Sequence, residues 1–178
     1  MEQVNLHTAI REGTLIQVPA SLLTVENLTA PNVAGSTPLH TAARYGRLRE
    51  LPAAALTAET LGRKNESGYT PLHHAAERGH LDQVPAALLT REHLEVRSNS
   101  GYTVFHVAAA NGHLGQLPPG ILTEDIVRQK TELGNTLLHE AAENGALRAV
   151  PAAFLTGALL AERNVTRAAV RVGMTHLG

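Results

Sequence analysis

Two stripes of apolar side chains with helical spacing lie within residues 68–100. The first consists of Leu72, Ala75 and Ala76, and the second of Leu81, Val84 and Leu88. Apolar residues three, four and seven positions apart lie on one face of a helix. The pattern therefore predicts two short antiparallel helices, each burying one face, and the small alanines of the first allow a neighbouring helix to approach closely.

The ends of these helices are marked by residues with strong conformational preferences. Thr70 before Pro71 predicts an N-cap hydroxyl followed by proline at the first helical position. Gly79 predicts the end of the first helix, because glycine readily takes the left-handed conformation. Pro85 is expected in or near the first turn of the second helix, since proline deeper in a helix costs about 3 kcal/mol.

A further short helix is predicted before the next glycine turn. Thr90 and Glu92 have the character of an N-cap and a first-turn acid, so we expect one extra turn of helix through Leu94. Each such unit exposes an apolar face that it cannot bury alone. The units are therefore expected to stack on one another.

The same pattern returns every 33 residues along the chain. Gly-x-Thr begins at Gly35, Gly68, Gly101 and Gly134. Apolar-His pairs carry their histidine at His7, His40, His73, His106 and His139. Prolines align at Pro19, Pro52, Pro85, Pro118 and Pro151. Several series in one register indicate an array of repeats.

This pattern resembles the ankyrin repeat, which has a period of about 33 residues and a Thr-Pro-Leu-His-x-Ala signature. The segments Thr70–Ala75 and Thr37–Ala42 match the signature, and Thr103–His106 and Thr136–His139 lack only its proline. The resemblance implies an all-α solenoid of stacked helix-turn-helix units joined by short turns. The chain departs from the family regularly in its second helix, where Val84–Leu94 and its copies replace the usual sequence.

We expect one repeat domain over residues 1–178, built as a capped array. Its parts are an N-terminal cap repeat at 1–34, in-register repeats at 35–67, 68–100, 101–133 and 134–166, and a divergent C-terminal capping helix or truncated repeat at 167–178.

Composition narrows the range of functions. The 178 residues carry 15 basic and 16 acidic side chains and no cysteine. The absence of basic excess argues against nucleic-acid binding, and the absence of cysteine excludes thiol nucleophiles and Cys-ligated zinc. No apolar run of about 20 residues is present for a membrane span. Without a secretory signal at its start, the chain is expected to be cytoplasmic, and we expect a monomer.

The aligned histidines raise the question of a metal site. Stacked helices lie about 8–10 Å apart, too far for imidazoles at the repeat spacing to share one ion. We expect each imidazole to hydrogen-bond the turn backbone beside its own helix. His139-Glu140-Ala141-Ala142-Glu143 resembles a zinc motif but lacks the second histidine. We therefore predict no metal, no cofactor and no catalytic residue.

The resemblance implies that the turn tips and the exposed side of the first helix form a concave partner-binding surface. The register places on it Arg44, Tyr45, Tyr69, His74, Glu77, Arg78, Tyr102, Asn111, Glu140, Glu143 and Asn144. All three tyrosines fall there, and Tyr and Arg are favoured at interfaces. The simpler alternative is that Tyr69 and Tyr102 only pack against neighbouring turns.

The sequence thus predicts a non-catalytic protein–protein interaction module. Charges of both signs on the predicted face favour a protein partner over nucleic acid. Two alternatives remain: a structural spacer or scaffold without a partner of its own and, supported only by the His139 segment, a metal-dependent enzyme.

Overall fold

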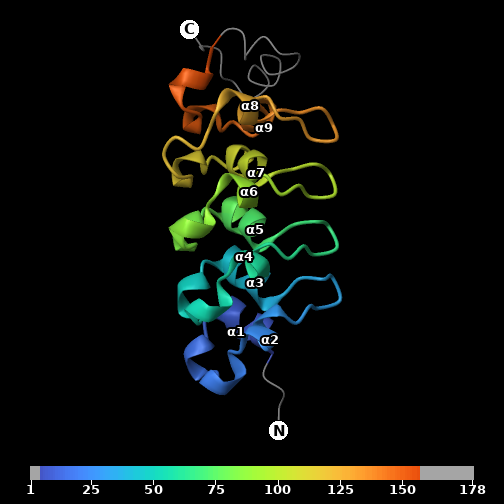
Figure 1. The fold of residues 1–178 in the computed structure, drawn as a ribbon, viewed down its shortest axis with the longest axis vertical. Coiled ribbons are helices and arrows are strands. Elements are labelled where there is room, and N and C mark those ends of the chain that lie inside the picture. Colours follow the sequence, from blue (N-terminus) through green and yellow to red (C-terminus); the bar gives the residue numbers. More distant parts are fainter. Residues whose placement is uncertain (1–4, 157–178) are drawn as a thin grey trace.

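The computed structural model describes residues 5–156, which form a stack of repeated helical units (Figure 1). Each unit contributes one longer helix, and each of these packs against the next along the stack. These helices are α1 (Leu6–Glu12), α3 (Pro38–Tyr45), α5 (Pro71–Arg78), α7 (Val104–Ala110) and α9 (Leu137–Glu143). The described part contains nine α-helices and no β-strand, which confirms the predicted all-α repeat solenoid.

Helix α5 shows why these residues form a helix of this length. Thr70 is its N-cap, Pro71 occupies the first position, and Gly79 ends it with a left-handed φ of 73°. Both predicted boundaries are confirmed. The buried stripe includes Ala75 and Ala76, each 0 % exposed, and the equivalent alanine pairs of α3, α7 and α9 are equally buried. Small side chains at these positions let the longer helices pack closely.

The predicted second helix is wrong. After α5 the chain forms two 3₁₀ turns, Leu81–Gln83 and Ala86–Leu88, separated by an extended Val84. Proline has no N–H to donate and disfavours helical geometry in the residue before it. Pro85 therefore interrupts the helix, although Leu81 and Val84 still bury their side chains as the apolar stripe requires.

The extra turn of helix is confirmed. Thr90 caps the short helix α6 (Arg91–Leu94), and Leu94 is fully buried. Equivalent short helices occur in the other units. They are α2 (Val25–Thr29), α4 (Ala58–Leu61) and α8 (Glu124–Val127).

Loops that precede the longer helices project from the same side of the stack, where Figure 1 shows them one above another. Backbone hydrogen bonds join neighbouring tips: Glu66 N to Ala34 O at 3.2 Å, Asn99 N to Ser67 O at 3.1 Å, and Glu132 N to Ser100 O at 3.1 Å. These bonds hold the tips at the spacing of the repeats. Residues 157–178, including the predicted C-terminal capping segment 167–178, and residues 1–4 of the predicted cap repeat lie outside the described part.

Two of the aligned histidines, His40 and His73, link their own helix to the following repeat. The His73 Nδ1 accepts the Thr70 backbone N–H at 3.1 Å and lies 2.8 Å from the Thr70 hydroxyl. Because a backbone N–H can only donate, the ring proton is on Nε2, which donates to the Tyr102 carbonyl at 3.1 Å. The predicted bond to the turn backbone is confirmed, and the link to the next repeat is additional.

The same link recurs at His40, whose Nε2 donates to the Tyr69 carbonyl of the following repeat at 3.0 Å. His106 Nε2 donates instead to the Gln129 carbonyl within its own repeat, at 3.0 Å. Burial lowers the pKa of His40, His73 and His106 to about 4 in each case. These imidazoles are therefore neutral in the folded protein at neutral pH.

We predict that stability decreases as the pH falls from about 6.5 toward 4. In this window the unfolded chain protonates these histidines and the folded chain does not, so lowering the pH favours unfolding. Each histidine contributes up to about 1.4 kcal/mol per pH unit. Urea unfolding of the wild type at several pH values measures the slope. His73→Gln should be less stable at pH 7.5 but show a shallower slope, and an unchanged slope would contradict the assignment.

Gly79 combines a left-handed backbone with a close neighbour in the next repeat. A Cβ there would lie 2.9 Å from His113 Nε2, whereas a Cβ at the equivalent Gly112, with φ 76°, would meet only Ala146 Cβ at 3.8 Å. The His113 ring is held by the Ala76 carbonyl at 2.8 Å and cannot move without losing that bond.

Both Gly79→Ala and Gly112→Ala should therefore lose about 1 kcal/mol from left-handed strain. Gly79→Ala should lose more, because the His113 ring must also shift. Denaturant titration of the two variants measures the difference, and equal losses would show that the contact with His113 contributes nothing.

Candidate functional site

The structure places the eleven predicted contact residues at different depths. The exposed ones are Arg44, Tyr45, Arg78, Asn111, Glu143 and Asn144. The half-buried ones are Tyr69, His74, Glu77 and Tyr102. Glu140 is buried, with 4 % of its surface exposed. The Glu140 carboxylate therefore affects this face only through the residues that donate hydrogen bonds to it.

Some of these residues line a hollow of about 360 Å³ between the second and third in-register repeats. Tyr69 and Tyr102 contribute from the ends of two successive loops, Glu77 from α5, and Asn111 from the residue after α7. The hollow is completed by Val107 and Ala110 of α7. Tyr45, by contrast, is 44 % exposed and lies outside this lining.

The sequence analysis missed Val107 and Ala110, although the register contains the signal. The positions equivalent to Val107 are Thr41, His74 and Glu140. The positions equivalent to Ala110 are Arg44, Glu77 and Glu143. Only the repeat at 101–133 has apolar side chains at both positions. The face is therefore depressed and apolar at this point, with polar groups around it.

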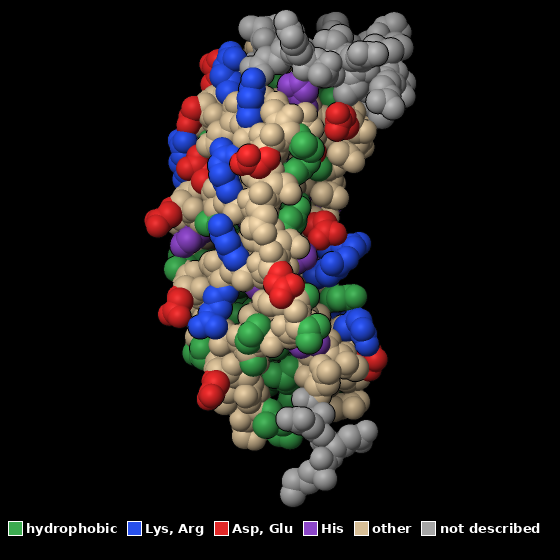
Figure 2. Space-filling model, turned by 90° about the vertical axis from the view of Figure 1, so that its right-hand side faces the viewer, with side chains coloured by type: hydrophobic (Ala, Val, Ile, Leu, Met, Phe, Trp, Pro, Cys, Tyr) green, Lys and Arg blue, Asp and Glu red, His purple; other side chains and the backbone are tan. Residues whose placement is uncertain are grey.

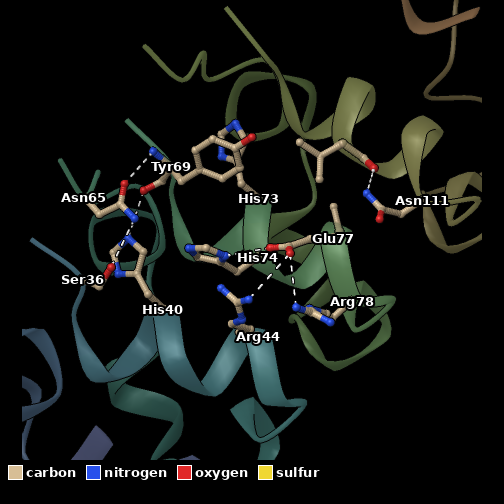
Figure 3. A network of polar contacts seen from close by, with 12 residues as sticks. Ser36, His40, Arg44, Asn65, Tyr69, His73, His74, Glu77, Arg78 and Asn111 are labelled. Carbon is tan, nitrogen blue, oxygen red and sulfur yellow. Dashed lines mark hydrogen bonds and ion pairs between the residues drawn. The ribbon is translucent and has the colours of Figure 1, made fainter. Parts of the chain in front are cut away.

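Glu77 forms one wall of the hollow through a small polar network (Figure 3). Its carboxylate lies 3.2 Å from His74 Nδ1, 3.5 Å from Arg78 Nη2 and 4.0 Å from Arg44 Nη2. The Tyr69 ring lies beside that of His74, with centroids 5.7 Å apart. Burial lowers the pKa of His74, and the hydrogen bond to Glu77 opposes that effect. The Glu77 carboxylate thus has two arginines beside it.

Tyr102 lines the opposite side of the hollow and is hydrogen-bonded there to the buried Glu140. The Tyr102 hydroxyl donates to Glu140 Oε1 at 3.0 Å, and Asn135 Nδ2 donates to the same oxygen at 3.0 Å. Burial, together with the nearby Glu140 and Glu143 carboxylates, raises the pKa of Tyr102 to about 12. The Tyr102 hydroxyl therefore stays protonated at neutral pH, and its hydrogen bond to Glu140 holds the ring in place.

His139 and Glu140 of the zinc-like segment have structural roles. His139 Nδ1 accepts from the Thr136 backbone N–H at 3.2 Å, and Glu140 accepts from Tyr102 and Asn135. Within residues 5–156, no group of three or more His, Asp or Glu side chains is arranged to hold a metal ion. In the same range, no helix has the length and apolar character needed to cross a membrane.

Comparison with protein families agrees with this architecture. Residues 50–118 match the model for ankyrin repeats in three copies. Residues 50–118 are therefore ankyrin repeats. The same order of loop, longer helix, 3₁₀ turns and short helix continues on both sides of the matched region. A comparison with curated proteins found no match. Ankyrin repeats are generally protein–protein interaction modules and are typically non-catalytic.

We predict that the two tyrosines of the hollow differ in their contribution to stability. Tyr102→Phe removes one of two donors from the buried Glu140 carboxylate and should cost about 1–3 kcal/mol. Tyr69→Phe is the matched control, because the Tyr69 hydroxyl has no hydrogen bond to another residue of the described range. Urea unfolding at pH 7 compares the two variants. A loss from Tyr69→Phe as large as that from Tyr102→Phe would contradict the assigned role.

Proposed function

We propose that this ankyrin-repeat chain binds a protein partner without catalysis. The contact surface is the face formed by the loop tips and the exposed side of the longer helices. The observation that carries the proposal is the hollow between Tyr69 and Tyr102, whose floor is the apolar pair Val107 and Ala110. Partly buried aromatic rings around an apolar depression are typical of the centre of a protein interface.

The charges on this face support a protein partner. Arg44 and Arg78 lie beside Glu77 on one side of the hollow, and Glu143 lies on the other side. Figure 2 looks onto the loop tips and shows acidic and basic side chains interspersed there. Nucleic-acid binding relies on a continuous basic surface, whereas mixed charges suit the surface of another protein.

The remaining predicted contact residues have narrower roles in this proposal. Tyr45 and Asn144 extend the face toward its two ends as exposed contacts. Glu140 holds the Tyr102 hydroxyl and does not itself contact the partner. His74 positions Glu77 through the bond at 3.2 Å.

A substitution that fills the hollow with a larger side chain tests the proposal. Partners captured from a cell lysate are identified by mass spectrometry, purified, and titrated against the wild type and Ala110→Trp. Tryptophan at the half-buried Ala110 should occupy the hollow and reduce affinity at least tenfold. The matched control is Ala87→Trp, which places the same side chain at an exposed position of the 3₁₀ turn Ala86–Leu88, away from the hollow.

Equal affinities of the wild type and both variants would overturn the proposed surface. A chain that captures no partner would instead favour the alternative of a spacer or scaffold. Circular dichroism of both variants before titration ensures that a loss of affinity is not a loss of fold.

A further inference from the structure

The hollow has apolar side chains and one carboxylate, Glu77, in its lining, and the carboxylates of Glu140 and Glu143 lie near Tyr102 on its other side. This combination favours one kind of side chain as a ligand. We propose that the hollow receives a lysine or arginine side chain from an extended segment of the partner protein. The proposal rests on the proposed function and specifies its ligand. It is argued from the shape of the hollow, from the distribution of charge around it, and from the position of one acid.

The shape of the hollow suits an unbranched aliphatic stem. Val107 is 5 % exposed and Ala110 is half-buried, so the floor is shallow and apolar. The rings of Tyr69 and Tyr102 border it from two successive loops. Lysine and arginine bury their stems along apolar surface and keep the charged group at the rim. Aromatic rings also attract a cation placed over their faces.

The charge around the hollow is compensated at one end only. Glu77, toward α3, has Arg44 and Arg78 within 4.0 Å. Glu140 and Glu143, toward α9, have no Lys, Arg or His within that distance among residues 5–156. The Glu140 carboxylate is buried and receives hydrogen bonds from neutral donors only. A cation supplied by the partner would balance the negative charge of Glu140 and Glu143 on this side of the hollow.

The effect of these acids reaches both tyrosines. Glu140 and Glu143 contribute to the raised pKa of Tyr102, and Glu77 and Glu140 contribute to that of Tyr69, in each case after burial. Carboxylates therefore lie close enough to both phenols to disfavour their ionisation, and the same charges favour an organic cation over a phosphate or a carboxylate as ligand.

The position of Glu143 points to a role in binding. It is the last residue of α9, where a negative charge interacts unfavourably with the helix dipole. The equivalent position carries Arg44 in α3 and Glu77 in α5, and Glu77 has Arg44 and Arg78 beside it. Glu143 is exposed and has no ion pair with another residue of the described range. Its charge thus opposes helix stability and remains available to a partner.

The side of the hollow near Glu77, Arg44 and Arg78 predicts a second feature of the partner segment. Arg44 and Arg78 remain partly exposed, at 42 % and 48 % of their side chains. They belong to the first and second in-register repeats and Glu143 belongs to the fourth, so two to three repeats separate them, which corresponds to about 20–30 Å between stacked helices. An extended chain advances about 3.3 Å per residue. We therefore expect an acidic residue about six to nine positions from the basic residue of the segment.

The test uses a display library of random twelve-residue peptides selected on the full chain. Bound peptides are eluted and then depleted on Ala110→Trp, so that those occupying the hollow are kept. Selected sequences should share one lysine or arginine. Each synthetic peptide is titrated with that lysine or with norleucine in its place, which keeps the stem and removes the charge. Norleucine should weaken binding about tenfold or more.

The protein side of the test is Glu143→Gln, with Glu92→Gln as the matched control at an exposed position of α6. Glu143→Gln should weaken the lysine peptide and reduce the difference between lysine and norleucine. Glu92→Gln should change neither. Raising the salt concentration should weaken the lysine peptide more on the wild type than on Glu143→Gln.

The outcomes separate this inference from the proposed function. Peptides that require an open hollow but contain no basic residue, or that bind equally well with norleucine, would overturn the lysine or arginine assignment and leave the proposed face intact. A selection that yields only peptides insensitive to Ala110→Trp, or no binder at all, would overturn the proposed face itself and the assignment with it.

Discussion

The structure depends on a neutral histidine that joins two repeats. Its Nδ1 accepts from the threonine that caps its own helix, and its Nε2 donates to a carbonyl of the following repeat, as His73 does with Thr70 and Tyr102. Both bonds require a single proton on Nε2. The second bond determines where the next loop lies relative to the helix, so at His40 and His73 the stacking of the repeats depends on the protonation state of one side chain.

The same links hold the candidate site in place. His40 binds the carbonyl of Tyr69, and His73 binds that of Tyr102. The two tyrosines that border the hollow are therefore held at their backbones by the repeats before them. Their side chains can remain partly exposed because the main chain needs no support from the rings. The interactions that stabilise the fold thus also define the width of the hollow.

Much of the fold could be predicted because local rules and the repeat period agree. Thr70, Pro71 and Gly79 fix both ends of α5, and the spacing of the histidines excludes a shared metal. The second helix was mispredicted because its apolar spacing was followed although Pro85 and its effect on Val84 oppose helix formation. The repeat period predicted which residues lie on this face, but it did not predict how deeply each of them is buried. Neither the burial of Glu140 nor the depression over Val107 and Ala110 was predicted, because each depends on what neighbouring repeats place beside it.

The tips of the loops are connected to one another by main-chain hydrogen bonds, as between Glu66 N and Ala34 O. Positions 33, 66, 99 and 132 carry Val, Glu, Asn and Glu, so this framework already accepts unrelated side chains. Substitutions there can alter recognition in one repeat while the spacing of all repeats is conserved. Binding specificity in such a chain can therefore evolve by separate, local changes, each of which leaves the scaffold and the neighbouring contacts in working order.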